Sequence, residues 1–302
     1  MSFELEKNLE TDELPIKDGN IIIADLTEEE LQFFEQYIDI TRFIQEIHQL
    51  YGIYCFNIEQ MKKRVSIKGD CIYDMQCERG IDKITINALT NNIISAGKTL
   101  IDHIDTLIDL YFGDKKTEGK NHFSSDEYDD VFAFRFMQQM RNFSQHCHLS
   151  VSTEIGGSCY FDLDIILSTP HIKHNKSLLE EMKKIKTDIE ENYNDLSHIS
   201  YTQIMFDFLC SVFRVYYVYT KVLLPEIKTM YLTMQEKISD NQYWINKTEN
   251  DKDFIIYKME DDVAHCLLVN ENCYNMFVEY KIEAKKNLKE YKKISKDIWR
   301  CV

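Results

Sequence analysis

The sequence predicts a mainly α-helical protein, an antiparallel helix bundle with small appended β-hairpins. Its 302 residues are 44% hydrophobic and 28% charged, which is a globular composition with enough apolar side chains for a core. Three prolines and nine glycines leave few helix breakers along the chain. Apolar residues also recur at helical intervals in several long segments. A sheet-rich sandwich is therefore disfavoured.

The first two long helices have clear boundaries. Thr27 and Glu30 have the spacing of a capping box, and apolar positions then recur at helical intervals to about Tyr51. A second helix is expected from about Ile84 to Phe112, closed by Gly113. Both helices carry one apolar face and should pack in a bundle.

Three pairs of short apolar runs are predicted to form β-hairpins. Each pair consists of β-branched or alternating residues on either side of a polar or glycine-containing turn. The pairs are 65–67 with 71–73, 149–155 with 161–165, and 243–246 with 254–257.

Three more helices are expected in the second half of the chain, at about 177–193, 201–236 and 273–299, and Pro225 should kink or divide the middle one. No repeat or linker separates these segments. The simplest organisation is one α-rich domain over residues 1–302, ending in a C-terminal hairpin and basic helix at 241–302.

The net charge of −16 argues against a protein that neutralises nucleic acid over its whole surface. Residues 281–300 are the exception, because eight cations face three acids there. This run is either a solvated helix face or a guide for RNA. The cations are Lys281, Lys285, Lys286, Lys289, Lys292, Lys293, Lys296 and Arg300.

The most apolar segment, 206–224, contains Asp207, Arg214 and Lys221, which are too costly for a lipid-facing helix. The nine cysteines include no C-x-x-C pair. We therefore expect a soluble, cytoplasmic protein with reduced cysteines and no membrane contact.

The segment from about Ser124 to His146 is predicted to be the helix that carries the chemistry. Ser124 and Glu127 have capping-box spacing, and a helical wheel places the apolar residues on one face. The opposite face is rich in amides and cations, with no carboxylate until Asp130, which suits a phosphate better than bulk water. It comprises Arg135, Gln138, Gln139, Arg141, Asn142, Gln145 and His146.

Within this face, four residues separate an arginine from a histidine in Arg141-Asn142-Phe143-Ser144-Gln145-His146, and a polar residue directly follows the arginine. The pattern resembles the R-x(4–6)-H motif of the HEPN superfamily, α-helical domains of which many are metal-independent endoribonucleases. The resemblance covers roughly residues 84–225, a HEPN-like core, and only the motif matches residue by residue.

The resemblance implies a toxin or anti-phage defence effector that cleaves RNA without a cofactor or metal. By the resemblance, Arg141 binds the scissile phosphate, His146 acts as general acid or base, and Asn142 positions the substrate. Two motifs would meet across a homodimer to form a composite active site, and an antitoxin or regulatory partner would hold the activity in check. Further substrate contacts are expected from Arg135, Gln138, Gln145 and His148, which is also the second candidate for the catalytic histidine.

Other interpretations remain open. Arg141 and His146 are also ordinary polar residues for a helix end, where an imidazolium interacts favourably with the helix dipole. A metal site at His146-Cys147-His148 or at His171 and His174 is disfavoured by ligand spacing, and no nucleophile elbow or P-loop is present. The main functional alternative is a non-catalytic HEPN-like module that binds nucleotides or proteins.

Overall fold

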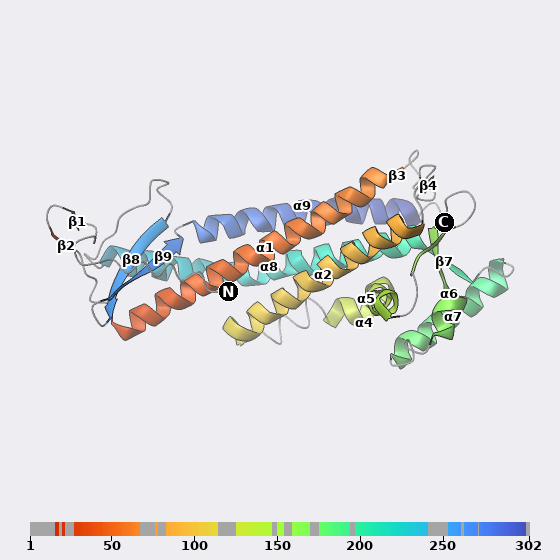
Figure 1. Cartoon of the computed structure of the whole chain (residues 1–302), viewed down its shortest axis with the longest axis horizontal. Helices are drawn as coiled ribbons and strands as arrows, with labels where there is room; N and C mark the ends of the chain where they lie inside the picture. The colour runs from red at the N-terminus through yellow and green to blue at the C-terminus, as the bar shows by residue number, and fades with distance from the viewer. Residues whose placement is uncertain are drawn as a thin grey trace. The chain divides into compact units, whose positions relative to one another are not determined.

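The computed structural model is mainly helical, as predicted, with eight helices and four small antiparallel sheets in the part of the chain that it describes (Figure 1). The described residues are 16–17, 20–21, 27–66, 76–77, 83–113, 125–146, 150–153, 159–169, 175–193, 197–240, 253–260, 263–270 and 272–299.

The chain divides into two compact units. The first comprises residues 1–46 and 220–282, and the second comprises residues 47–219 and 283–302. Three helices contribute to both units: α1 (Glu28–Arg64), α8 (Tyr201–Asp240) and α9 (Cys273–Trp299). The division falls inside helices, so no linker in the sequence marks it. The Arg141–His146 motif lies in the second unit.

The first unit joins the start of α1 to a β-hairpin. Strands β8 (Asp253–Glu260) and β9 (Val263–Asn270) pair antiparallel, with Ile256 opposite Leu267. The Tyr37 hydroxyl on α1 donates a hydrogen bond to the Asn270 carbonyl at 3.0 Å. Strand β8 contains the predicted strand at 254–257, and its partner β9 was not predicted; residues 243–246, the predicted partner, lie outside the described residues. Strands β1 (Ile16–Lys17) and β2 (Asn20–Ile21) form a second small hairpin.

The capping box of α1 is present. The backbone N–H of Glu30 donates to Thr27 Oγ1 at 3.2 Å, and the backbone N–H of Thr27 donates to Glu30 Oε2 at 3.0 Å. The helix continues beyond the predicted end near Tyr51 to Arg64, because Ile58 and Met61 are buried in the second unit. Strand β3 (Val65–Ser66) then pairs with β4 (Gln76–Cys77), and residues 71–73, the predicted partner, lie outside the described residues.

Four helical segments form the core of the second unit: the end of α1, α2 (Lys83–Tyr111), the first half of α8 and the end of α9. Thr90 contacts Tyr201, and Gly97 lies against Phe208 and Val212, so α2 and α8 run in the same direction. Tyr201 contacts Met61, whereas His48 contacts Tyr216, so α1 runs antiparallel to α8. The same reasoning makes α9 antiparallel to α8, because Tyr291 packs on Phe213 and Ser295 bonds Asp207. The bundle is thus mixed rather than wholly antiparallel, as the ribbons in Figure 1 show.

Aromatic rings fill this core. Tyr51 stacks on Tyr216 with ring centroids 3.9 Å apart, and Phe213 packs edge-on against Tyr51 and Tyr54. Most aromatic residues of α8 between 206 and 219 are less than 5% exposed, as expected for core packing. Gly97 lets α2 approach this cluster, because a Cβ atom there would lie 3.2 Å from the Tyr54 ring. Burial of these large side chains is the main stabilising contribution in the unit.

A three-stranded sheet closes one end of the second unit. Strand β6 (Cys159–Asp162) pairs with both β5 (Ser152–Thr153) and β7 (His198–Ser200). The predicted strand at 161–165 was wrong beyond Asp162. That residue caps helix α6 (Leu163–Ser168), because its Oδ1 accepts hydrogen bonds from the backbone N–H groups of residues 164 and 165.

Helix α7 (Lys176–Tyr193) matches its predicted position, and so does α9. Helix α8 continues through Pro225 without a division and ends at Asp240. None of the described helices combines the length and the apolar character that a bilayer crossing requires.

His48 should make the stability of the protein depend on pH. Its Nδ1 is hydrogen-bonded to the Tyr216 hydroxyl at 3.0 Å, and burial lowers the pKa of its imidazole below 6.5. Below about pH 6.5 the unfolded chain then binds a proton that the folded chain does not, so acidification destabilises the fold. This loss is complete only once the pH has fallen below the folded pKa.

We expect the melting temperature to fall less between pH 7.5 and pH 5.5 in His48→Gln than in the natural protein, because glutamine does not titrate. Thermal unfolding followed by circular dichroism at the two pH values measures this. Equal decreases in the two proteins would contradict the assignment.

Candidate functional site at the end of helix α5

The motif lies on a helix that is shorter than the sequence predicted. Residues 125–146 form two helices, α4 (Ser125–Asp130) and α5 (Phe132–His146), separated at Val131. The single helix predicted from Ser124 was therefore wrong at this point. Ser124 itself lies outside the described residues.

Arg135 explains how the chain tolerates this break. Its Nη1 donates hydrogen bonds to the carbonyl oxygens of Tyr128, at 2.6 Å, and of Asp129. Carbonyl groups at the end of a helix lack intrahelical hydrogen-bond donors, and here the guanidinium provides those donors. Its Nη2 also donates to Glu181 Oε2 on α7 at 2.5 Å, and the Arg135 side chain is only 11% exposed. The structure thus places this predicted substrate-binding residue in a structural network.

Glu127 anchors α4 to helix α8. Its side chain is 5% exposed and forms an ion pair with Arg214 on α8. The glutamate predicted for a capping box therefore ties α4 to the bundle. A buried carboxylate that lost its cation would cost several kcal/mol by general precedent, about 3–5.

The motif residues occupy the C-terminal turns of α5 and differ in exposure. Arg141 is half-buried, Asn142 is exposed, and His146 is exposed as the last residue of the helix. Phe143 between them is 1% exposed and fixes this face of α5 against the core. At 100° per residue, Arg141 and His146 lie about 140° apart around the helix axis.

Arg141 has no acid partner among the described residues. Arg42 pairs with Asp39, Arg135 with Glu181 and Arg214 with Glu127, whereas no ion pair or side-chain hydrogen bond of Arg141 occurs in this part of the chain. Its Nε is buried and lacks an acceptor there. A buried donor without an acceptor costs about 1–3 kcal/mol. An anion that binds the guanidinium would remove this penalty.

The remaining predicted contacts are placed only in part. Gln138 is half-buried on α5. The side chain of Gln145, and all of Cys147, His148, His171 and His174, lie outside the description. Among the described residues, no group of three or more histidine, cysteine or acidic side chains is arranged to hold a metal ion.

Asn87 on α2 is the functional-site residue that sequence reasoning missed. It is 1% exposed, and its amide pairs with the backbone of Val151 in both directions: Nδ2 donates to the carbonyl at 2.9 Å, and Oδ1 accepts from the N–H at 2.8 Å. The amide therefore fixes the chain just after the motif helix. The available signal was an asparagine on the apolar face of α2, beside Ile86.

A cavity of about 540 Å³ adjoins the motif. Phe143 of α5 and Lys83 of α2 line it, with Ser150 and Ser152 from the segment that Asn87 holds. Asp162, Ile165, Ile166 and Ser168 complete the lining. The Ser150 hydroxyl is buried, with no hydrogen-bond partner in the described residues.

Cysteine nucleophiles are disfavoured at two positions. Burial raises the pKa of the Cys55 and Cys210 thiols to about 12, so both are protonated at neutral pH. A protonated thiol is a poor nucleophile.

Comparisons with protein-family models, curated proteins and solved structures gave no match to this chain. The resemblance to the HEPN superfamily rests on the motif and on the helix that carries it.

Replacement of Asn87 by leucine should destabilise the protein by about 2–4 kcal/mol, because the Val151 N–H and C=O groups would remain buried without partners. Urea unfolding measures the change. Asn192→Leu, at an exposed position on α7, is the matched control and should cost less than about 0.5 kcal/mol. Equal effects at the two positions would contradict the role of Asn87.

Substitutions of Arg135 and Arg141 should have different effects on the stability of the protein. Arg135→Gln should lower the free energy of unfolding by about 1–3 kcal/mol, since it leaves Glu181 and two helix-end carbonyls without their donor. Arg141→Gln should leave it unchanged or raise it by up to about 1–3 kcal/mol, because no described partner is lost and the buried Nε without an acceptor is removed. The reverse order of the two values would show that Arg141 holds the fold.

Proposed function

We propose that this protein is a metal-independent endoribonuclease whose catalytic residues are Arg141, Asn142 and His146. The observation that carries the proposal is that Arg141 alone, among the arginines whose side chains are described, has no acid partner. In a chain of net charge −16, an unpaired and partly desolvated guanidinium is well suited to bind a phosphate.

The residue types fit the chemistry. One imidazole acts as the base that removes the proton from the 2′-hydroxyl, and the 2′-oxygen attacks phosphorus. The bond from phosphorus to the 5′-oxygen breaks, and a protonated imidazole supplies the proton to that oxygen. Arginine stabilises the charge that builds on the phosphoryl oxygens. The products are a 2′,3′-cyclic phosphate and a 5′-hydroxyl.

A second copy of the chain would supply the second imidazole. Each chain has one motif histidine at the end of α5, whereas the reaction uses one base and one acid. Asn142 and His146 are both exposed, so they are accessible to the other motif. Histidine titrates near neutrality, which allows one copy to be neutral while the other is protonated.

The cellular role that we propose, a toxin or anti-phage defence effector, follows from the HEPN-like motif. Such an activity needs restraint, which an antitoxin or regulatory partner would provide. No cofactor has a part in this mechanism.

A non-catalytic nucleotide-binding module is the second candidate. The cavity beside Phe143 favours it, because Lys83 and the buried hydroxyl of Ser150 offer donors for a phosphate. In that case the protein would bind nucleotides and leave RNA intact.

The two candidates are distinguished by incubation of the purified protein with total RNA in EDTA. We expect cleavage by the natural protein, and a decrease of at least 100-fold in Arg141→Ala and in His146→Ala, as is typical for the loss of a general acid–base group. The termini of the fragments should carry 2′,3′-cyclic phosphate and 5′-hydroxyl groups.

Arg42→Ala and His103→Ala are matched controls, since both residues lie on other helices and Arg42 is 56% exposed. Both should retain the activity of the natural protein. Cleavage that persists in the motif variants, or that requires a divalent metal, would refute the proposed mechanism. Nucleotide binding without cleavage would support the second candidate.

A further inference from the structure

The second half of α9 lines a cavity of about 790 Å³, which we call the α9 lysine groove. Tyr217 of α8 and Leu288 contribute apolar surface, and Glu290 is the one acidic residue in the lining. The other lining residues are the lysines at 285, 286, 289, 292, 293 and 296. None of the motif residues lines this groove.

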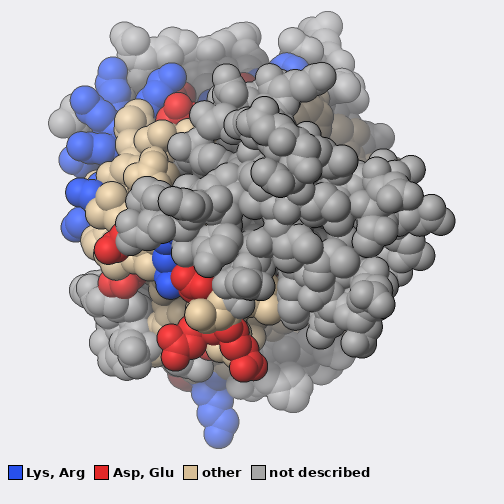
Figure 2. All heavy atoms as spheres, turned by 90° about the vertical axis from the view of Figure 1, so that its left-hand side faces the viewer, with Lys and Arg blue, Asp and Glu red and all other residues tan. Residues whose placement is uncertain are grey.

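These six lysines are exposed, and within the described residues none lies within 4 Å of a carboxylate oxygen. Some other lysines of the unit do pair with acids, among them Lys98 with Asp102 and Lys186 with Asp164. Glu290 lies 3.8 Å from Lys62 of α1, so its charge is partly compensated. The groove is therefore a concentration of positive charge on a strongly acidic protein. Figure 2 shows one face of the molecule, on which described basic and acidic side chains gather in different places.

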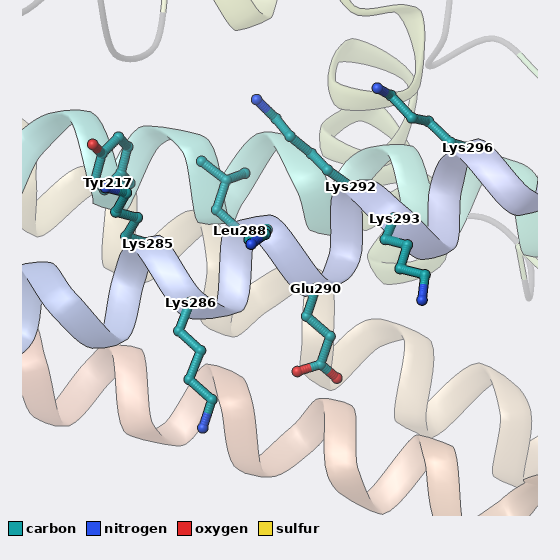
Figure 3. Close-up of a pocket in the computed structure, with 9 residues that line it drawn as sticks. Tyr217, Lys285, Lys286, Leu288, Glu290, Lys292, Lys293 and Lys296 are labelled. Carbon is teal, nitrogen blue, oxygen red and sulfur yellow. The ribbon is translucent and has the colours of Figure 1, made fainter.

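The lysines follow the helix in a regular row. Lys285, Lys289, Lys292 and Lys296 are spaced by four, three and four residues, which places them on one side of α9. At 1.5 Å per residue this row is about 16 Å long. In Figure 3, Lys292 and Lys296 extend to one side of the helix, and Lys286 and Lys293 extend to the other. The ammonium groups thus flank a path that an extended polyanion can follow.

Tyr217 gives the groove an aromatic surface. Its neighbours Phe213, Tyr216 and Tyr219 are at most 1% exposed in the core, whereas Tyr217 is half-buried and lines the groove beside Lys285 (Figure 3). Rows of cations with an aromatic side chain are typical of sites for single-stranded nucleic acid, where phosphates contact the cations and a base stacks on the ring.

Two other polyanionic partners fit less well. An anionic membrane favours a basic helix that can insert an apolar face, but Ala284, Leu288 and Tyr291 of α9 are at most 7% exposed. An acidic peptide would contact the lysines but has no base that could stack on an aromatic ring in the groove. A single nucleic-acid strand uses both the lysines and Tyr217.

Helix α9 packs on the part of α8 that also holds the start of the motif region. Tyr291 of α9, the neighbour of Lys292, packs on Phe213 of α8 with ring centroids 4.6 Å apart. The next residue of α8, Arg214, pairs with Glu127 of α4, which leads into α5. Lys292 and the start of the motif region are thus both tied to the same turn of α8.

We propose that the α9 lysine groove binds a single strand of RNA. Its phosphates contact Lys285, Lys289, Lys292 and Lys296, and one base stacks on Tyr217. This binding does not require cleavage at Arg141 and His146, so it holds or fails independently of the proposed function.

The test measures fluorescence anisotropy of a labelled 2′-O-methyl RNA 12-mer, which cannot be cleaved by 2′-hydroxyl attack, at several salt concentrations. One variant replaces Lys285, Lys289, Lys292 and Lys296 by glutamine. The control variant makes the same change in net charge on α2 and α7, at Lys98, Lys176, Lys183 and Lys184.

We expect the groove variant to bind at least tenfold more weakly at 100 mM salt, and the control variant to stay within twofold of the natural protein. For a single strand, the slope of log K against log salt changes by about 0.7 for each lost phosphate contact, so it should become shallower by about 2–3. Tyr217→Leu should weaken binding by about fivefold or more, because a stacked base is lost.

Equal losses in the groove and control variants would overturn the proposal, since they would show a general charge effect. If polyglutamate displaces the labelled RNA as well as unlabelled RNA of equal total charge does, the groove binds acidic peptides and the proposal is overturned. Binding to vesicles with 30% phosphatidylserine that exceeds binding to RNA would overturn it in favour of a membrane. Circular dichroism verifies that each variant is folded. If the variant with four substitutions is not folded, a variant with only Lys289→Gln and Lys292→Gln replaces it, and its RNA affinity should fall at least threefold.

Discussion

Burial of the first half of α8 is the interaction on which the motif-carrying unit depends. Tyr201, Phe208, Phe213 and Tyr216 are at most 1% exposed and contact α1, α2 or α9. Each buried aromatic ring removes a large apolar area from water, so this helix forms the common surface for its neighbours. Gly97 shows how closely they pack, since a Cβ atom there would lie only 3.2 Å from Tyr54 and 3.3 Å from Val212.

Polar contacts then position the short helices that this core cannot hold by itself. Helix α4 has six residues and α5 has fifteen, lengths at which an isolated helix is marginal in water. Glu127 ties α4 to α8, Arg135 ties the break and α5 to α7, and Asn87 holds the chain after α5. The same contacts leave Arg141 unpaired within the described residues. A fixed scaffold beside an available guanidinium is the arrangement that phosphate chemistry needs.

Sequence reasoning was most accurate for long helices with a continuous apolar face. It placed α2 within one residue at each end and α9 at its observed ends, because helical periodicity over many residues averages out local exceptions. It failed where a single polar side chain decides the local structure. Asp162 ends a strand and begins α6, although Phe161, Leu163 and Ile165 alternate like strand residues. The break at Val131 is stabilised by Arg135, seven residues beyond the carbonyl of Tyr128 that it contacts.

The sequence by itself determined the helical class, the capping box of α1, the amphipathic faces and the lysine row of α9. These properties depend on neighbours within about one helical turn, so they can be recognised from spacing. Only the tertiary structure decided which cations are already paired. Arg135 and Arg141 both lie on the polar face of the same predicted helix and were both expected to contact the substrate, but Glu181, 46 residues away from Arg135, makes Arg135 a structural residue and leaves Arg141 to the candidate site. Likewise, the packing of α9 on α8 placed Tyr217 among the lysines, because a contact between residues far apart in the chain exists only after the core has formed.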